Sequence, residues 1–266
     1  MTNTEQQVTL DDGAQTILER WGERGPVMLC VHGMTSSRKS WERFAQHYAS
    51  RYRVYAYDQR GHGDSAAVPG PMTLHRCLLD LYNVMEAIAD PVDVLLGHSW
   101  GGAVAILGGR RFDVRRVFAV DPMIRQADNP WYDEFLTDLR TLFAAKGEAR
   151  DAKIDEEYRA LGWGDIDVER KKHAVRSMTT TPIERLRDEN PPESWDLRGD
   201  LEAYPKPLLL AMAGVESIVP LDDLKTVRER GGPNVAIRMF DDQGHNLHRT
   251  AFERFTAEVD RFLERS

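Results

Sequence analysis

Short runs of apolar and β-branched residues alternate along this chain with longer stretches in which apolar positions recur at helical spacing. The runs predict strands at 27–32, 53–57, 92–96, 116–120, 207–212 and 235–240, and the stretches predict helices at 39–51, 73–89, 100–111, 221–230 and 248–264. Two further short strands are expected before Gly25. Strands that alternate with helices predict an α/β fold with a mostly parallel sheet covered by helices on both faces.

The alternation stops between about residues 121 and 204, where no run has the character of a strand. Helical pieces are predicted in this segment at 131–145, 151–161 and 167–178, separated by Gly162, Gly164 and Pro182. Their charges are mixed in sign, as is typical of solvated helix faces. We therefore expect a core of residues 1–121 and 205–266, with residues 122–204 forming a helical cap inserted after the sixth strand.

The composition is that of an ordinary globular protein, and it argues against some classes of binding partner. Hydrophobic residues make up 41% and charged residues 29% of the 266 positions, which argues against a mainly disordered or fibrous chain. The net charge of −8 gives no general attraction to nucleic acids or to anionic membranes. We expect a small-molecule substrate, no nucleic-acid or membrane partner, and a monomer or homodimer.

Two other features bear on the compartment and on metals. Residues 1–12 are polar and resemble neither a signal peptide nor a transmembrane helix, so a cytoplasmic location is expected. The chain has two cysteines, Cys30 in a predicted strand and Cys77 in a predicted helix, and both are interpreted as reduced and buried. Neither a metal nor another cofactor is expected.

The pentapeptide Gly97-His98-Ser99-Trp100-Gly101 lies between a predicted strand and a predicted helix. A serine hydroxyl is a weak nucleophile unless it is held exposed beside a base, and a tight strand-to-helix turn provides that exposure. The glycines let the backbone turn sharply and let the helix start close to the sheet. Ser99 is therefore the candidate nucleophile of a nucleophile elbow.

Further motifs follow other predicted strands, where functional groups of a parallel sheet gather. They are His32-Gly33, the segment DQRGHGDS at 58–65, the elbow at 97–101 and Gly244-His245. Because these motifs occur in this order and at these strand ends, the chain resembles the α/β-hydrolase superfamily of serine esterases and lipases from about Val27 to the C-terminus. The helical insertion matches the cap that many members carry.

The resemblance implies a catalytic triad. Ser99 would attack a carbonyl carbon, and His245 would take and later return its proton. The family position of the acid is the loop after the 207–212 strand, which holds Glu216 where aspartate is more common. The alternative acid is Asp121, after the 116–120 strand, and Asp222 and Asp223 also satisfy the Ser–acid–His order.

The resemblance also assigns an oxyanion hole to the backbone N–H groups of Met34 and Trp100. His32 is expected to support the loop that carries Met34, whereas His62 is expected to have a structural role and His248 to be half exposed.

A serine at the elbow argues against haloalkane dehalogenases and epoxide hydrolases of this superfamily, which use aspartate there. The favoured activity is hydrolysis of a carboxylic ester or lactone of a small, partly hydrophobic substrate through an acyl-enzyme on Ser99. Amide, thioester and C–C bond hydrolysis with the same triad remain alternatives. So do a non-catalytic small-ligand receptor and a cofactor-free oxygenase on the same fold.

Overall fold

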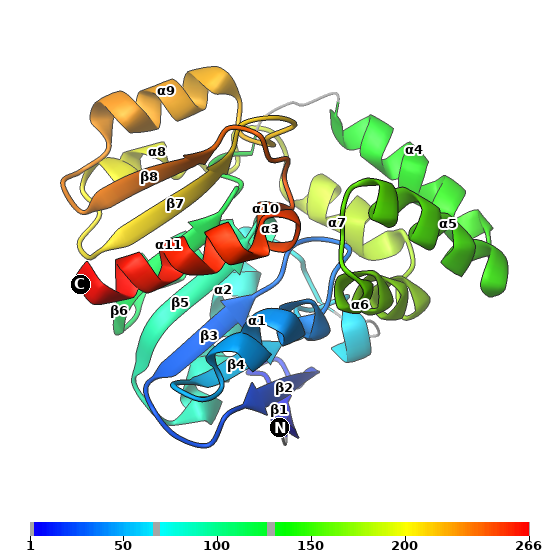
Figure 1. Cartoon of the computed structure of the whole chain (residues 1–266), viewed down its shortest axis with the longest axis horizontal. Coiled ribbons are helices and arrows are strands. Elements are labelled where there is room, and N and C mark those ends of the chain that lie inside the picture. The colour runs from blue at the N-terminus through cyan, green and yellow to red at the C-terminus, as the bar shows by residue number, and fades with distance from the viewer. Residues whose placement is uncertain (1–2, 66–69, 127–130, 266) are drawn as a thin grey trace.

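Eight strands form one sheet in the computed structural model, which describes residues 3–65, 70–126 and 131–265 (Figure 1). The strands are β1 (Asn3–Thr9), β2 (Gln15–Trp21), β3 (Val27–Val31), β4 (Arg53–Tyr57), β5 (Val92–His98), β6 (Val114–Val120), β7 (Leu208–Ala213) and β8 (Val235–Phe240). Their spatial order is β1-β2-β4-β3-β5-β6-β7-β8. Strands β3 to β8 are parallel, while β2 pairs antiparallel with β4 and β1 antiparallel with β2. The predicted mostly parallel sheet is confirmed.

The helices of the described residues follow the predicted pattern closely. They are α1 (Glu42–Tyr48), α2 (Leu74–Ile88), α3 (Trp100–Arg111), α4 (Trp131–Ala144), α5 (Glu148–Ala160), α6 (Asp165–Arg176), α7 (Thr181–Glu189), α8 (Arg198–Glu202), α9 (Leu221–Arg230), α10 (Leu247–Thr250) and α11 (Phe252–Arg265), with short 3₁₀ turns η1 (Arg38–Trp41) and η2 (Gly63–Ser65). Helices α7 and α8 were not predicted. Pro182, interpreted as a separator, lies in the first turn of α7, where its fixed φ and missing N–H are tolerated.

Alternate residues of the central strands face two separate apolar cores. In β3, Val27, Leu29 and Val31 belong to the core that includes side chains of α2 and α3. Met28 and Cys30 belong to the core on the other face, with side chains of α1 and α11. All five are fully buried, and burial of such side chains contributes about 1.5–3 kcal/mol each. The sheet is thus a rigid platform covered by helices on both faces (Figure 1).

Between β6 and β7 the chain leaves the sheet and forms α4 to α8, and α4 to α7 lie to one side of the sheet (Figure 1). The two ends of this insertion are joined by backbone hydrogen bonds. Leu197 N–H donates to Ile124 C=O at 2.8 Å, Gln126 N–H to Trp195 C=O at 3.1 Å and Glu193 N–H to Gln126 C=O at 2.8 Å. A helical insertion after the sixth strand is therefore present, and the cap boundaries at 122 and 204 stay predictions.

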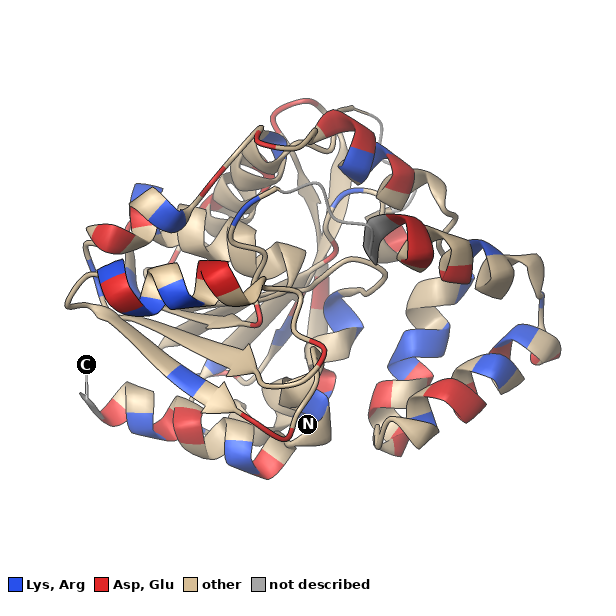
Figure 2. Cartoon of the chain, turned by 90° about the horizontal axis from the view of Figure 1, so that it is seen from above, with Lys and Arg blue, Asp and Glu red and all other residues tan. Residues whose placement is uncertain are grey.

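Charges on the outer helices are mixed in sign, as the sequence predicts, whereas the strands carry few of them (Figure 2). Within the described residues, no helix is both long enough and apolar enough to cross a lipid bilayer. The cytoplasmic location and the monomeric or homodimeric state stay predictions. Cys30 and Cys77 are buried free thiols, as expected.

Candidate active site

Ser99 stands at the sharp turn between β5 and α3, with φ 57° and ψ −123°. A non-glycine residue with positive φ is strained by about 1–3 kcal/mol, and the surrounding packing must hold it in place. A side chain at Gly97 would strike the carbonyl of Gly101, and one at Gly101 would strike the carbonyls of Val31 and His32. Both glycines are therefore needed for the close approach of strand and helix that the elbow requires.

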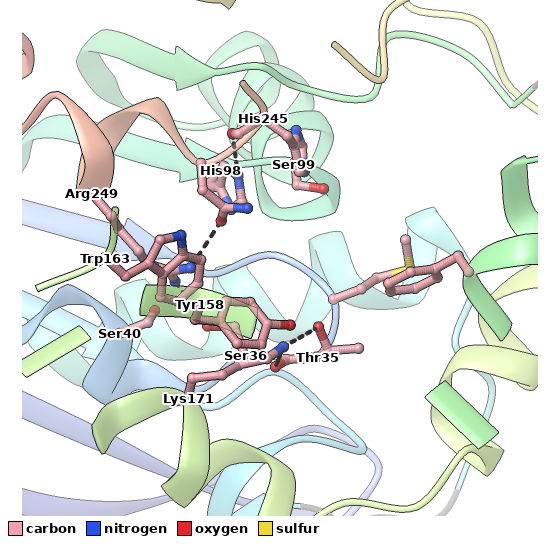
Figure 3. A pocket seen from close by; sticks show the side chains of 13 residues that line it. Thr35, Ser36, Ser40, His98, Ser99, Tyr158, Trp163, Lys171, His245 and Arg249 are labelled. Atoms are coloured by element: carbon pink, nitrogen blue, oxygen red, sulfur yellow. Dashed lines mark hydrogen bonds between the residues drawn. The ribbon is translucent and has the colours of Figure 1, made fainter. Parts of the chain in front are cut away.

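His245 follows β8 in the loop before α10 and lines the same pocket as Ser99 (Figure 3). Its Nδ1 lies 2.7 Å from Oδ2 of Asp121, the residue directly after β6. Since Asp121 is fully buried, the carboxylate fixes the imidazole from inside the protein. The structure therefore brings His245 and Asp121 together, although β7 lies between the strands that they follow.

Four donors surround the Asp121 carboxylate. Oδ1 accepts from Ala213 N–H at 3.1 Å and from the Ser217 hydroxyl at 2.7 Å, while Oδ2 accepts from Ile218 N–H at 3.2 Å and from His245. Each oxygen thus has two partners, which satisfies the acceptor capacity of an ionised carboxylate. The arrangement fixes the position of the Asp121 carboxylate.

The preference for Glu216 as the partner of His245 does not agree with this geometry. Glu216 is exposed in the loop between β7 and α9, and within the described residues it makes no hydrogen bond to His245. The loop instead donates to Asp121 from Ser217 and Ile218, and Ala213 at the end of β7 donates as well. The loop that was expected to hold the acid therefore positions a carboxylate that follows the neighbouring strand, β6.

The other two acids considered also lie away from His245. Asp222 is exposed on α9. Asp223 is buried and binds Arg125 at 2.6 Å and Arg198 at 2.9 Å, one arginine near each end of the segment inserted between β6 and β7. Asp223 therefore ties both ends of this segment to α9.

The two residues expected to provide oxyanion donors lie on either side of Ser99. Trp100 is the first residue of α3, so its N–H has no acceptor within the helix. Met34 lines the pocket and follows Gly33, where an added Cβ would lie 2.9 Å from Cβ of Ser99. Their assignment as oxyanion donors stays a prediction.

His32 supports the loop before Met34, as expected. Its Nε2 accepts from Gln59 N–H at 3.0 Å, so Nδ1 carries the proton and donates to Gly33 C=O at 2.8 Å. Burial lowers the pKa of His32 to about 4, which keeps the ring neutral and this tautomer in place. His62 is also buried, and its ring packs edge-on against His32 at 5.2 Å.

Sequence reasoning missed that the His98 ring packs against both His245 and His248. His98, inside the elbow, donates from Nε2 to the carbonyl of His245 at 3.1 Å, and their rings lie 4.5 Å apart. His248 is buried rather than half exposed, and its ring lies 4.4 Å from that of His98. Burial lowers the pKa of both rings well below the usual value, so both are neutral. The loop of His245 thus rests on uncharged rings.

The pocket above Ser99 has a volume of about 100 Å³ and is lined by residues of the strand ends and of the inserted helices (Figure 3). Its lining residues are Met34, Thr35, Ser36, Ser40, His98, Ser99, Phe135, Tyr158, Trp163, Lys171, His245, Asn246 and Arg249. Phe135, Tyr158, Trp163 and Lys171 come from the segment inserted between β6 and β7, and no sequence motif identified them. Within the described residues, no cluster of three or more potential metal ligands is present.

A family model described as "Alpha/beta hydrolase family" matches residues 28–258, which include every strand from β4 to β8 and each motif of the site. The chain belongs to the alpha/beta hydrolase family. N-formylmaleamate deformylase of Pseudomonas putida is 24% identical over 255 residues, covering 92% of this chain and 91% of that protein. This alpha/beta hydrolase is also 39% identical over 90 residues to Epoxide hydrolase 4 of Mus musculus, a match that covers 32% of this chain and only 25% of that protein.

Solved structures show the same fold at low sequence identity. The structure of E-2-(acetamidomethylene)succinate hydrolase superposes with a TM-score of 0.78 at 19% identity, covering 99% of this chain and 100% of that one. At this identity the likeness shows the shared fold alone.

Proposed function

We propose that the protein is a serine hydrolase that cleaves a carboxylic ester or lactone of a small molecule through an acyl-enzyme on Ser99. His245 is the general base and Asp121 the acid of the triad. The observation that supports this most is the contact of a fully buried, four-fold hydrogen-bonded carboxylate with Nδ1 of a histidine that shares a pocket with a strained elbow serine.

The proposed first step is attack of Ser99 Oγ on the acyl carbon. Because Asp121 accepts from Nδ1–H of His245, the lone pair of Nε2 is available to take the serine proton. The negative charge that develops on the carbonyl oxygen would be stabilised by the N–H groups of Met34 and Trp100, each contributing about 3 kcal/mol. The protonated His245 then gives its proton to the departing alcohol, and the acyl group stays on Ser99.

The second step reverses the roles. A water molecule gives a proton to Nε2 of His245 and its oxygen attacks the acyl carbon. As the C–O bond to Ser99 breaks, His245 returns that proton to Ser99 Oγ, and the free acid leaves. The buried Asp121 stabilises the imidazolium in both steps. With a serine at position 99, we do not propose an epoxide-opening route.

Hydrolysis of a C–N bond is the second candidate, because the relative aligned over nearly the whole chain is named a deformylase. The same residues serve this reaction, with the difference that His245 must protonate a nitrogen leaving group. Ester and amide substrates therefore need to be compared on one preparation.

The test is turnover of p-nitrophenyl acetate and of p-nitroformanilide by the wild type and by Ser99→Ala. We expect Ser99→Ala to lose turnover by about 10³-fold or more, and an exposed-serine control, Ser50→Ala, to retain it. A fluorophosphonate should add its phosphonyl mass to the peptide that contains Ser99. Turnover that survives Ser99→Ala contradicts the proposal, as does saturable binding without turnover, which would indicate a receptor.

A further inference from the structure

The pocket above Ser99 holds two buried cationic side chains and no carboxylate among its lining residues. Lys171 comes from α6 of the cap and is 8% exposed, while Arg249 comes from α10 of the core and is 7% exposed. Buried cations are costly unless an anion or several hydrogen bonds compensate them. Their partners therefore decide what the pocket can accept.

Lys171 has only neutral partners. Its Nζ donates to the carbonyl of Thr35 at 3.1 Å and to the Thr35 hydroxyl at 2.9 Å, and it lies 5.1 Å from the centre of the Tyr158 ring. Among the described residues it forms no ion pair with a carboxylate. An ammonium group has three N–H donors, so one of the three has no partner in these contacts.

Arg249 is likewise incompletely paired. Its guanidinium stacks on Trp163 at 4.1 Å, Nη1 donates to Asn246 Oδ1 at 2.9 Å and Nη2 to Ser36 Oγ at 3.4 Å. Its Nε is buried and makes no hydrogen bond within the part of the chain that the structure describes. The Asp167 carboxylate is 4.0 Å from this Nε, beyond hydrogen-bond distance.

Both cations reach consecutive residues of one loop, Thr35 and Ser36, which directly follow Met34 beside Ser99 (Figure 3). Asp167, the carboxylate nearest to Arg249, also pairs with Arg43, so its charge is shared. Burial and the charge of Arg249 lower the pKa of Lys171 to about 7, as is expected for an ammonium group without a counter-ion.

We propose that Lys171 and Arg249 bind a carboxylate of the substrate, so that the natural substrate is a short acid whose carboxylate lies a few bonds from the scissile acyl carbon. A carboxylate is the smallest organic oxyanion, and the cavity of about 100 Å³ must hold it together with the acyl group. Each of its oxygens can accept from one cation. This proposal rests on the proposed attack by Ser99 only for the location of the reacting bond.

Binding can be measured without turnover. Calorimetry on Ser99→Ala would compare monomethyl succinate with methyl 4-methylpentanoate, a neutral ester in which a branched methyl pair replaces the carboxylate oxygens. We expect the anionic ester to bind at least tenfold more tightly. Equal affinities, or tighter binding of the neutral ester, would overturn the proposal.

Substitutions in the Ser99→Ala background then identify the residues. Lys171→Met and Arg249→Met should each reduce the anionic-to-neutral affinity ratio about tenfold. Matched controls should leave it unchanged: Lys172→Met, next to Lys171 but ion-paired with Asp155 at 2.6 Å and Glu169 at 2.7 Å, and Arg254→Met, which pairs with Asp242 at 2.7 Å.

An unchanged ratio in both pocket variants would refute the assignment of these residues. The two-ligand comparison on Ser99→Ala needs no further substitution, so it remains decisive if a pocket variant does not fold. It also separates two failures. Selective binding of the anion without any turnover by the wild type would contradict the proposed hydrolysis but support the carboxylate site. Turnover of p-nitrophenyl hemisuccinate and p-nitrophenyl 4-methylpentanoate at equal efficiency would support the hydrolysis but contradict the carboxylate site.

Discussion

His245 Nδ1 lies 2.7 Å from Oδ2 of Asp121, although the two residues are 124 positions apart in the chain. The contact joins the end of β6 to the loop that follows β8, with β7 between them in the sheet. The acid was expected in the loop after β7. The end of β7 and this loop instead donate hydrogen bonds to the Asp121 carboxylate. This relationship leads directly to a test that separates the two candidate acids.

We predict that Asp121→Asn lowers kcat by about 10³-fold or more, because an amide at this position no longer fixes the required tautomer of His245 or stabilises its imidazolium. Glu216→Gln should change kcat by less than about threefold, since Glu216 is exposed. Steady-state kinetics on both variants checks this. A large loss for Glu216→Gln together with a small one for Asp121→Asn would reverse the assignment.

The Ser217 hydroxyl should contribute to catalysis through Asp121 alone. It donates to Oδ1 of Asp121 at 2.7 Å and accepts from Val219 N–H at 3.1 Å. Loss of one such hydrogen bond is worth about 1 kcal/mol, so Ser217→Ala should lower kcat about fivefold with little change in KM. The control is Ser177→Ala, because the Ser177 hydroxyl lies at the end of α6 and donates to the Ala174 carbonyl of that helix. A change confined to KM would argue against a positioning role.

Gly33→Ala tests the close approach of the Met34 loop to the elbow. The new Cβ would lie 2.9 Å from both Ser99 Cβ and His98 Nδ1, which forces the loop or the elbow to shift. We expect kcat/KM to fall at least about tenfold, because shifts of this size misplace the reacting groups. Gly199→Ala, where nothing lies within 4 Å of the added Cβ, should behave as the wild type. Wild-type activity in Gly33→Ala would show that the loop tolerates the methyl group.

Binding of an anionic ester should depend on pH through Lys171. With a pKa of about 7, Lys171 is cationic below that pH and neutral above it, and the groups that act on it are Arg249, which lowers the pKa, and Glu157, which raises it. At one pH unit above the pKa only about a tenth of the side chains carry the charge. Affinity for monomethyl succinate should therefore weaken as pH rises from about 6 to 8.

Two measurements check this pH dependence. Calorimetry in buffers of different ionisation enthalpy should show proton uptake on binding near pH 8, because a bound carboxylate favours the charged form of Lys171. In Lys171→Met the affinity should lose this pH dependence. Proton uptake that persists in Lys171→Met would assign it to another group.

The features predicted correctly from sequence are those set by local spacing. The turn at Ser99 could be predicted because the glycines around it allow strand and helix to approach closely, and the strand and helix on either side have clear apolar periods. Asp121 could not be preferred over Glu216 from sequence. Both follow parallel strands, and the choice depends on how the loop after β7 folds over its neighbour, which is a tertiary property.

The pocket walls were less predictable for the same reason. Lys171 and Lys172 are neighbours on α6 and are almost equally buried, but Lys172 is paired with the carboxylates of Asp155 and Glu169. Nothing in the local pattern separates the two. Only the packing of α6 against the loop of Thr35 directs Lys171 to neutral partners, while Lys172 meets two carboxylates.

The backbone hydrogen bonds between Ile124 and Leu197 and between Gln126 and Trp195 make the inserted segment start and finish at almost the same point of the core. A segment with adjacent ends can be exchanged for another without moving the strands that carry Ser99, Asp121 and His245. New substrate preferences can therefore arise by changes confined to one stretch of the gene. A chimera that takes this segment from a relative should keep the chemistry and acquire the donor's selectivity.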